Sequence, residues 1–162
     1  MNKMELQNLK DNEMLDQAID ALRQTAGLDI EVTKLKIHGF LNRADAFIRV
    51  TINTKIYAFV VEIKNIDRFA MVAQVKHQLE EFEERPLLIA PKLTDAAADK
   101  CKELGLNFID LAGNAYINEP GLFIFIKGQK QELHQNNPMN YFKGNKALTP
   151  TNLRMVFALL QS

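Results

Sequence analysis

The stretch YAFVVEIKN, residues 57–65, has the pattern of a buried β-strand, yet it ends in charged residues. Aromatic and β-branched residues fill its first half, which favours a strand. Glu62 and Lys64 are two residues apart, and side chains at that spacing on a strand point to the same side of a sheet. A carboxylate and an ammonium group at the end of a buried strand must have partners, because unpaired charges are costly to bury.

Composition limits the classes of protein to consider. The chain has 162 residues, of which 47% are hydrophobic, which suits one globular domain with a substantial core. Its formal net charge is zero, so any basic surface for nucleic acid must be local. Cys101 is the single cysteine, which excludes a disulfide framework, and we predict a packing role for it. No apolar run approaches the roughly 18 residues that span a bilayer, and the polar N-terminal segment is unlike a signal peptide. We therefore expect a cytoplasmic protein with no membrane contact.

Apolar periodicity and turn residues predict a mixed order of helices and strands. The predicted helices span residues 3–26, 68–84 and 95–105, and the predicted strands span 29–37, 45–52, 55–64, 85–90, 106–117 and 121–128. The uninterrupted apolar strand RPLLIA (85–90) is typical of a sheet that is covered on both sides. This order predicts an α/β sandwich, with a central mixed sheet and helices on both faces.

Composition changes after residue 128. Residues 129–149 are rich in Asn and Gln and are predicted to be a polar linker, and residues 150–162 are predicted to begin a helix. That helix either packs back on the domain or begins a second one. From residue 121 onward there are five Lys or Arg residues and one acidic residue, so this segment, with Lys127 and Lys130, is either a local DNA-binding surface or a solvated linker.

The hairpin between residues 45 and 64 places a third charge beside the first two. If Asn53 and Thr54 form a two-residue turn, Asp45 lies directly opposite Glu62, with Cβ atoms about 5 Å apart. Two carboxylates at that distance repel each other unless a cation lies between them. That cation could be a lysine, which would make the group a structural salt bridge. Mg²⁺ suits the same position equally well, because it binds one or two carboxylates together with phosphate oxygens and water. With a metal present, Lys64 would act on the attacking water or on the phosphate.

The order of elements and charges resembles the PD-(D/E)XK nuclease superfamily, which has the restriction-endonuclease-like fold, and within it the Holliday-junction-resolvase-like branch. The resemblance covers about residues 10–127 and includes Asp45 in RADAFIRV, Glu62 and Lys64 in VVEIKN, and Gln74 or Gln78 in MVAQVKHQLEEF. It implies a metal-dependent DNA endonuclease that hydrolyses phosphodiester bonds.

The same resemblance implies a role for each matched residue. Asp45, Glu62 and the Ile63 carbonyl would bind Mg²⁺ or Mn²⁺, Lys64 would assist the water, and the helix glutamine would position the DNA strand. A glutamate from the first helix often joins the site; Glu13 is our candidate, and the same helix also offers Glu5 and Asp16. Ala44 stands where the signature has proline. Resolvases of this fold are often dimers, so a homodimer is possible.

A second resemblance favours DNA binding without cleavage. GLNFIDLAGNAYI followed by GLFIFIKG and a polar segment is similar to bacterial AbiEi-type antitoxins or transcriptional regulators, in which a nuclease-like domain adjoins a winged helix. It implies a DNA-binding regulator with a toxin protein as a possible partner, and it makes residues 150–162 the first helix of a truncated winged-helix domain. A third possibility is a domain for protein association alone.

Other polar residues were weighed against structural roles. Asp110 and Asn114 flank a predicted bulge or turn at Gly113, or else form a wall of the active cleft. Arg49 shares a face with Asp45 and either pairs with an acidic residue or contacts phosphate. The histidines, His38, His77 and His134, have no zinc-binding spacing. No glycine-rich phosphate loop is present, so no nucleotide cofactor is expected.

Overall fold

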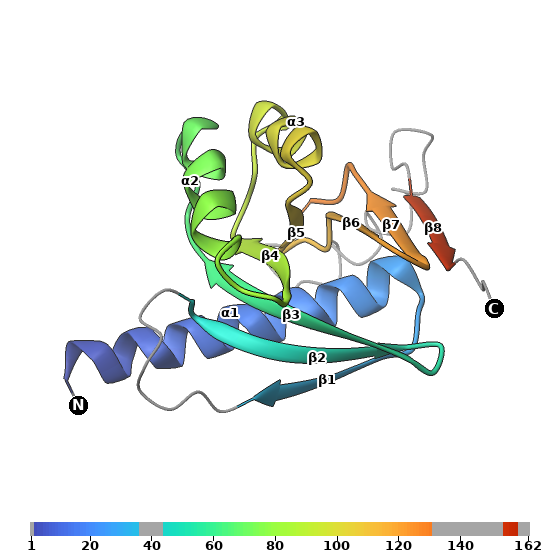
Figure 1. Cartoon of the computed structure of the whole chain (residues 1–162), viewed down its shortest axis with the longest axis horizontal. Coiled ribbons are helices and arrows are strands. Elements are labelled where there is room, and N and C mark those ends of the chain that lie inside the picture. Colours follow the sequence, from blue (N-terminus) through green and yellow to red (C-terminus); the bar gives the residue numbers. More distant parts are fainter. Residues whose placement is uncertain (1, 36–43, 131–153, 159–162) are drawn as a thin grey trace, which may run out of the picture.

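The computed structural model describes residues 2–35, 44–130 and, for the backbone alone, 154–158. Three helices and eight strands follow one another along the chain (Figure 1). Their bounds are α1 (Lys3–Ala26), β1 (Ile30–Leu35), β2 (Ala46–Ile52), β3 (Lys55–Ile63), α2 (Ala70–Leu79), β4 (Arg85–Ala90), α3 (Asp95–Leu104), β5 (Asn107–Asp110), β6 (Ala115–Glu119), β7 (Leu122–Ile126) and β8 (Arg154–Ala158).

All eight strands form one mixed sheet whose spatial order is the order of the sequence, β1 to β8. β1, β2 and β3 pair antiparallel, β3, β4 and β5 pair parallel, and β5 to β8 pair antiparallel. The α2 and α3 crossovers make the parallel pairs possible, because parallel strands cannot be joined by a tight turn. The predicted α/β sandwich with a mixed central sheet is therefore confirmed.

Helix α1 covers one face of the sheet. The side chain of Asn2 accepts a hydrogen bond from the Glu5 backbone in a capping box, and Gly27 ends the helix at a φ of 65°. These signals place the helix at the predicted residues. Its buried residues, among them Leu15 and Leu22, pack in one cluster with alternate residues of the central strands.

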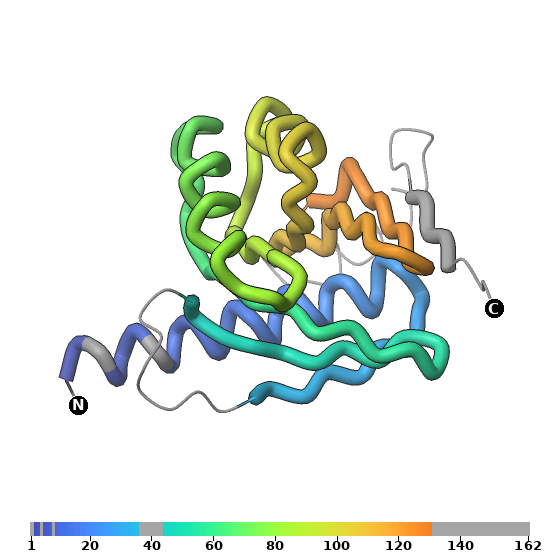
Figure 2. Tube along the Cα trace, viewed as in Figure 1, coloured from blue at the N-terminus to red at the C-terminus, as the bar shows by residue number. Residues whose placement is uncertain are grey.

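Helices α2 and α3 cover the opposite face, side by side in Figures 1 and 2. The second cluster of buried residues joins Val75 and Leu79 of α2 with Cys101 of α3 and with the remaining alternate residues of β3, β4 and β5. Burial raises the pKa of the Cys101 thiol to about 12, so this cysteine is an inert packing residue, as predicted.

The β2–β3 hairpin confirms the predicted register. Asn53 and Thr54 have φ values of 50° and 68°, as both central residues of a type I′ turn require. Ile52 pairs with Lys55, and the ladder continues to Ala46 opposite Val61. That register carries Asp45 to the level of Glu62.

Two predicted elements need correction. Helix α2 ends at Leu79 and does not reach residue 84, because the chain must turn before entering β4 and because Pro86 disfavours a helical conformation at Arg85. The predicted helix in residues 150–162 is wrong at residues 154–158, which form β8 against β7. A short apolar run fits a helix and a strand alike, and the free backbone groups along the edge of β7 favour the strand.

Parts of the other predictions lie outside the described residues. These are the connector around His38, most of the 129–149 linker including His134, and the rest of residues 150–162. In the part of the chain that the structure describes, no helix is both long and apolar enough to cross a membrane.

Candidate functional site

The candidate site lies at the edge of the sheet where β3, β4 and β5 end and β2 begins. Because β3 runs antiparallel to β2, the end of β3 meets the start of β2 at this edge. The Asp45 backbone N–H donates to the Val61 carbonyl at 2.9 Å. One side-chain oxygen of Asp45, Oδ2, accepts from the Ile63 backbone N–H at 2.7 Å. The carboxylate of Asp45 is thus fixed against the last residues of β3.

Asp45 and Glu62 form a pair of interacting carboxyl groups, called the acid pair below. The pKa of Glu62 is raised from 4.5 to about 8, chiefly by burial and also by a hydrogen bond to Asp45 and the charge of Asp45. Gln78 and Lys64 act in the opposite direction. Glu62 is half-buried and Asp45 is exposed, so Glu62 is the carboxyl group that holds a proton near neutral pH.

Gln78 of α2 holds the Glu62 carboxyl group in place. Its side-chain amide Nε2 donates a hydrogen bond to Glu62 Oε2. Gln74 lies one helical turn earlier and is exposed. The structure therefore selects Gln78 from the two glutamines that the sequence proposed.

Ile63 and Lys64 complete this edge of the sheet. In an extended strand the N–H and C=O of one residue point to the same side, so the Ile63 carbonyl, like its N–H, is directed toward Asp45. The Lys64 backbone N–H donates to the Ile89 carbonyl of β4 at 2.9 Å. Its side chain is half-buried, and its ammonium group makes no ion pair within 4 Å among residues 2–35 and 44–130.

Helix α1 brings Asp11, and not the predicted Glu13, toward the acid pair. Burial raises the pKa of Asp11, and the neighbouring charge of Asp45 raises it further. Asp11 continues the buried stripe of Leu15 and Ala18 at helical spacing, whereas Glu13, two residues on, lies about 200° around the helix and is exposed.

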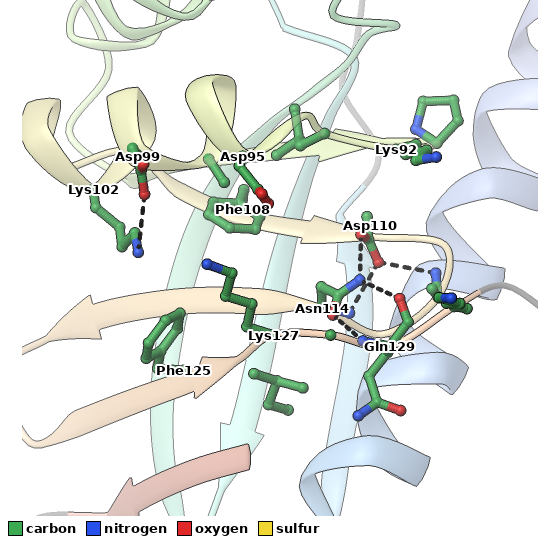
Figure 3. A pocket seen from close by; sticks show the side chains of 17 residues that line it. Lys92, Asp95, Asp99, Lys102, Phe108, Asp110, Asn114, Phe125, Lys127 and Gln129 are labelled. Carbon is green, nitrogen blue, oxygen red and sulfur yellow. Dashed lines mark hydrogen bonds and ion pairs between the residues drawn. The ribbon is translucent and has the colours of Figure 1, made fainter. Parts of the chain in front are cut away.

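The candidate DNA contacts lie apart from one another. Arg49 is exposed on β2, four residues along the strand from Asp45, which corresponds to about 13 Å. Lys127 and Lys130 are exposed just after β7. They line a pocket of about 620 Å³ between α3 and the sheet, called the α3 pocket below and formed by residues within 91–102, 108–114 and 125–130 (Figure 3).

Asp110 and Asn114 form a hydrogen-bonded turn at the back of this pocket (Figure 3). Asp110 Oδ1 accepts from the backbone N–H groups of Ala112 and Asn114, each at 2.9 Å, and Oδ2 accepts from the Asn114 amide at 2.8 Å. Burial raises the pKa of Asp110, and these hydrogen bonds act against that rise. Gly113 has a φ of 92°, as the predicted turn requires. The predicted turn is confirmed, and both polar residues also line the α3 pocket.

The donor atoms at the acid pair suit a hard divalent cation. Within the described ranges, no group of three or more His, Cys, Asp or Glu residues is placed to hold a metal ion. Two carboxylates and a backbone carbonyl are nevertheless all oxygen donors, and Mg²⁺ typically keeps several waters beside one or two carboxylates. A cation would also replace the proton that the acid pair shares.

No protein-family model matches this chain, and neither a curated protein nor a solved structure does. Its own residues therefore carry the functional argument.

Sequence reasoning missed three contributors to this edge. Asp11 was one of several acidic residues on an amphipathic helix, and the helical stripe shared with Leu15 is the signal that selects it. Lys92 and Lys102 lie in and beyond the loop after β4, and nothing in their local sequence marked them. Only the crossover of α3 brings them opposite Lys127.

Proposed function

We propose that this chain is a metal-dependent nuclease that hydrolyses phosphodiester bonds in DNA at the acid pair. The observation that carries the proposal is the placement of two carboxyl groups at one sheet edge: the hairpin register brings Asp45 beside Glu62, the Ile63 N–H holds Asp45, and Gln78 holds Glu62. The raised pKa of Glu62 agrees with this crowding. Such a pair is unfavourable when both groups are ionised, unless a cation joins them. Strongly shifted carboxyl groups in pairs are characteristic of catalytic sites.

Asp45, Glu62 and the Ile63 carbonyl would hold Mg²⁺ or Mn²⁺. When bound, such an ion polarises a phosphoryl oxygen and lowers the pKa of a water molecule. Gln78 keeps the Glu62 carboxylate oriented through its hydrogen bond, and Asp45 is oriented by the Ile63 N–H. Both carboxylates are therefore fixed before any ligand binds.

Lys64 supplies positive charge where a phosphate would lie. It follows Glu62 by two residues, so the strand geometry places both side chains on one face of the sheet. Because its ammonium group has no ion-pair partner within the described residues, it is available to orient the attacking water or to neutralise charge on the phosphate. The order of elements, with the antiparallel hairpin followed by parallel β4, agrees with the resemblance to PD-(D/E)XK nucleases.

A cleavage assay tests the proposal. Supercoiled, linear and branched DNA are incubated with the protein in Mg²⁺, in Mn²⁺ and in chelator. Glu62→Gln and Lys64→Ala should each reduce the cleavage rate at least a hundredfold, and Glu83→Gln, an exposed acidic residue beyond α2, should leave it unchanged. Cleavage that survives chelator or survives Glu62→Gln would refute a site at the acid pair.

Binding without cleavage would point to the second function. If the protein shifts DNA in a gel at low salt, and no metal yields cleavage, the regulator or antitoxin function becomes the better one. Its affinity should then fall steeply with salt, as expected for contacts to the phosphate backbone.

A further inference from the structure

The α3 pocket opens on the same edge and the same face of the sheet as the acid pair. Val60, Leu88 and Phe108 all belong to the buried cluster under α2 and α3. Glu62 follows Val60 by two residues and Asp110 follows Phe108 by two, so both carboxyl groups lie on that face at the ends of parallel strands. Only β4 separates β3 from β5, which puts the pocket about 10 Å from the acid pair.

Positive charge exceeds available negative charge in this pocket. Lys92, Lys127 and Lys130 line it, are exposed, and make no ion pair within 4 Å among the described residues. Lys102 pairs with Asp99 at 3.4 Å.

The lining holds four lysines and three aspartates, Asp95, Asp99 and Asp110, so the lysines exceed the acidic residues by one. Asp110 is 4% exposed and both of its oxygens accept hydrogen bonds from the protein, so it faces the pocket less than the exposed lysines do. The pocket therefore favours an anionic ligand.

Two aromatic side chains, Phe108 and Phe125, line the pocket beside the lysines. Phe125 of β7 is half-buried, and the Lys102 ammonium lies 4.5 Å from the centre of its ring. Phe108 is buried and stacks on Tyr116, outside the lining, with ring centres 6.3 Å apart. Figure 3 shows the Lys102 and Lys127 ammonium groups in the space between α3 and these strands.

Aromatic rings next to unpaired lysines are the combination that binds single-stranded nucleic acid, because bases stack on rings and phosphates pair with ammonium groups. A volume of about 620 Å³ accommodates one or two nucleotides. A duplex, whose bases are already stacked and paired, presents no free base to Phe125.

We propose that the α3 pocket binds a single-stranded segment of the DNA substrate, with a base against Phe125 and phosphates on Lys92 and Lys127. This inference rests on the proposed nuclease function, and it specifies the substrate. The separation of about 10 Å places the bound segment within a few nucleotides of the scissile phosphate. The preferred substrate then has a single-stranded stretch beside the cut.

Binding is measured by fluorescence anisotropy with a labelled twelve-nucleotide thymidine strand and the matched duplex, in chelator so that no cleavage occurs. The full chain should bind the single strand at least tenfold more tightly than the duplex. Lys92→Ala and Lys127→Ala should each weaken single-strand binding about fivefold or more and lower the salt slope by about 0.7. Phe125→Leu, which keeps an apolar group, should weaken it at least fivefold.

Two control variants test whether these effects are specific to the pocket. Lys10→Ala, on the exposed part of α1, and Glu83→Gln, at an exposed residue beyond α2, should bind the single strand within twofold of the unmodified chain. Unfolding in urea identifies any variant that does not fold. If Phe125→Leu does not fold, the pocket is still tested by Lys127→Ala, because Lys127 is exposed and its replacement leaves the core unchanged.

The outcomes are distinct. Single-strand binding that is unaffected by all three pocket variants, or no preference over duplex, would overturn the pocket assignment even if Glu62-dependent cleavage is found. Weakened binding in these variants without any cleavage would support the pocket and leave the nuclease proposal refuted.

Discussion

Replacing Glu62 by Gln tests the shared proton directly, without any DNA. The pKa of Glu62 is raised from 4.5 to about 8 in the folded chain, first by burial and then by Asp45. Between these two pH values the folded state binds a proton that the unfolded state has released. Stability therefore falls as the pH rises from about 4.5 to about 8, and the loss is complete above the folded pKa. Gln cannot ionise, so the variant does not lose this stability.

The size of the effect follows from the shift. At about 1.36 kcal/mol per pH unit, a shift from 4.5 to about 8 sets an upper bound near 5 kcal/mol. Glu62 is only half-buried, so solvent screening reduces the expected value to about 2 kcal/mol. For a chain of 162 residues, this corresponds to about 4 to 8 °C in Tm.

The assay is urea and thermal unfolding of both proteins at pH 5 and pH 9, in chelator. Glu62→Gln should match the unmodified chain at pH 5 and exceed its stability by about 2 kcal/mol at pH 9. The control Glu83→Gln should show no such pH dependence. An equal difference between the proteins at both pH values, or a less stable variant at pH 9, would refute the shared proton.

Three further predictions concern the same edge and its support. Mg²⁺ or Mn²⁺ should raise the Tm of the unmodified chain more at pH 8.5 than at pH 5.5, because the metal competes with the proton on Glu62. The Tm of Glu62→Gln should show no such pH-dependent increase. Equal Tm shifts in both proteins would contradict this prediction. Gln78→Ala removes a hydrogen bond that lowers the pKa of Glu62, so urea unfolding should show about 1 kcal/mol less stability and a stability loss displaced to higher pH. Gly113→Ala should lower the free energy of unfolding in urea by about 3 kcal/mol or more, because the new Cβ would lie 2.6 Å from the Thr25 side chain. Gly27→Ala, whose Cβ would have no atom within 4 Å, should lower it by about 1 kcal/mol. Similar losses in both variants would contradict the steric argument.

Local signals made much of the fold predictable. The Asn cap and Gly27 fixed the bounds of α1, and the Asn53–Thr54 turn fixed the register of the hairpin, because each depends on residues close together in the sequence. Register then placed Asp45 by Glu62. The site residues on β2 and β3 could be predicted for this reason.

Features that depend on how distant elements meet were beyond such reasoning. Asp11 reaches the neighbourhood of Asp45 only because of the angle at which α1 crosses the sheet. The α3 pocket combines three segments far apart in the sequence. β8 depends on the edge of β7, and the apolar run at residues 155–157 carries no information about that edge.

The side chains at the two ends of the parallel strands differ in how they are paired, and this difference supports a functional site at the carboxyl ends. At the amino ends, polar side chains pair with one another: Arg85 forms an ion pair with Glu119 at 2.8 Å, and Asn107 donates to the same carboxylate at 2.8 Å. At the carboxyl ends, Lys64 and Lys127 have no ion-pair partner among the described residues, and Glu62 lies beside Asp45 with a raised pKa. Ligands of open α/β sheets bind outside the carboxyl ends of the parallel strands. The acid pair lies at the carboxyl end of β3, and the α3 pocket lies at the carboxyl end of β5. A polyanion lying along this edge would meet the lysines of the α3 pocket and Lys64, and it would meet a divalent cation where Asp45 and Glu62 hold one.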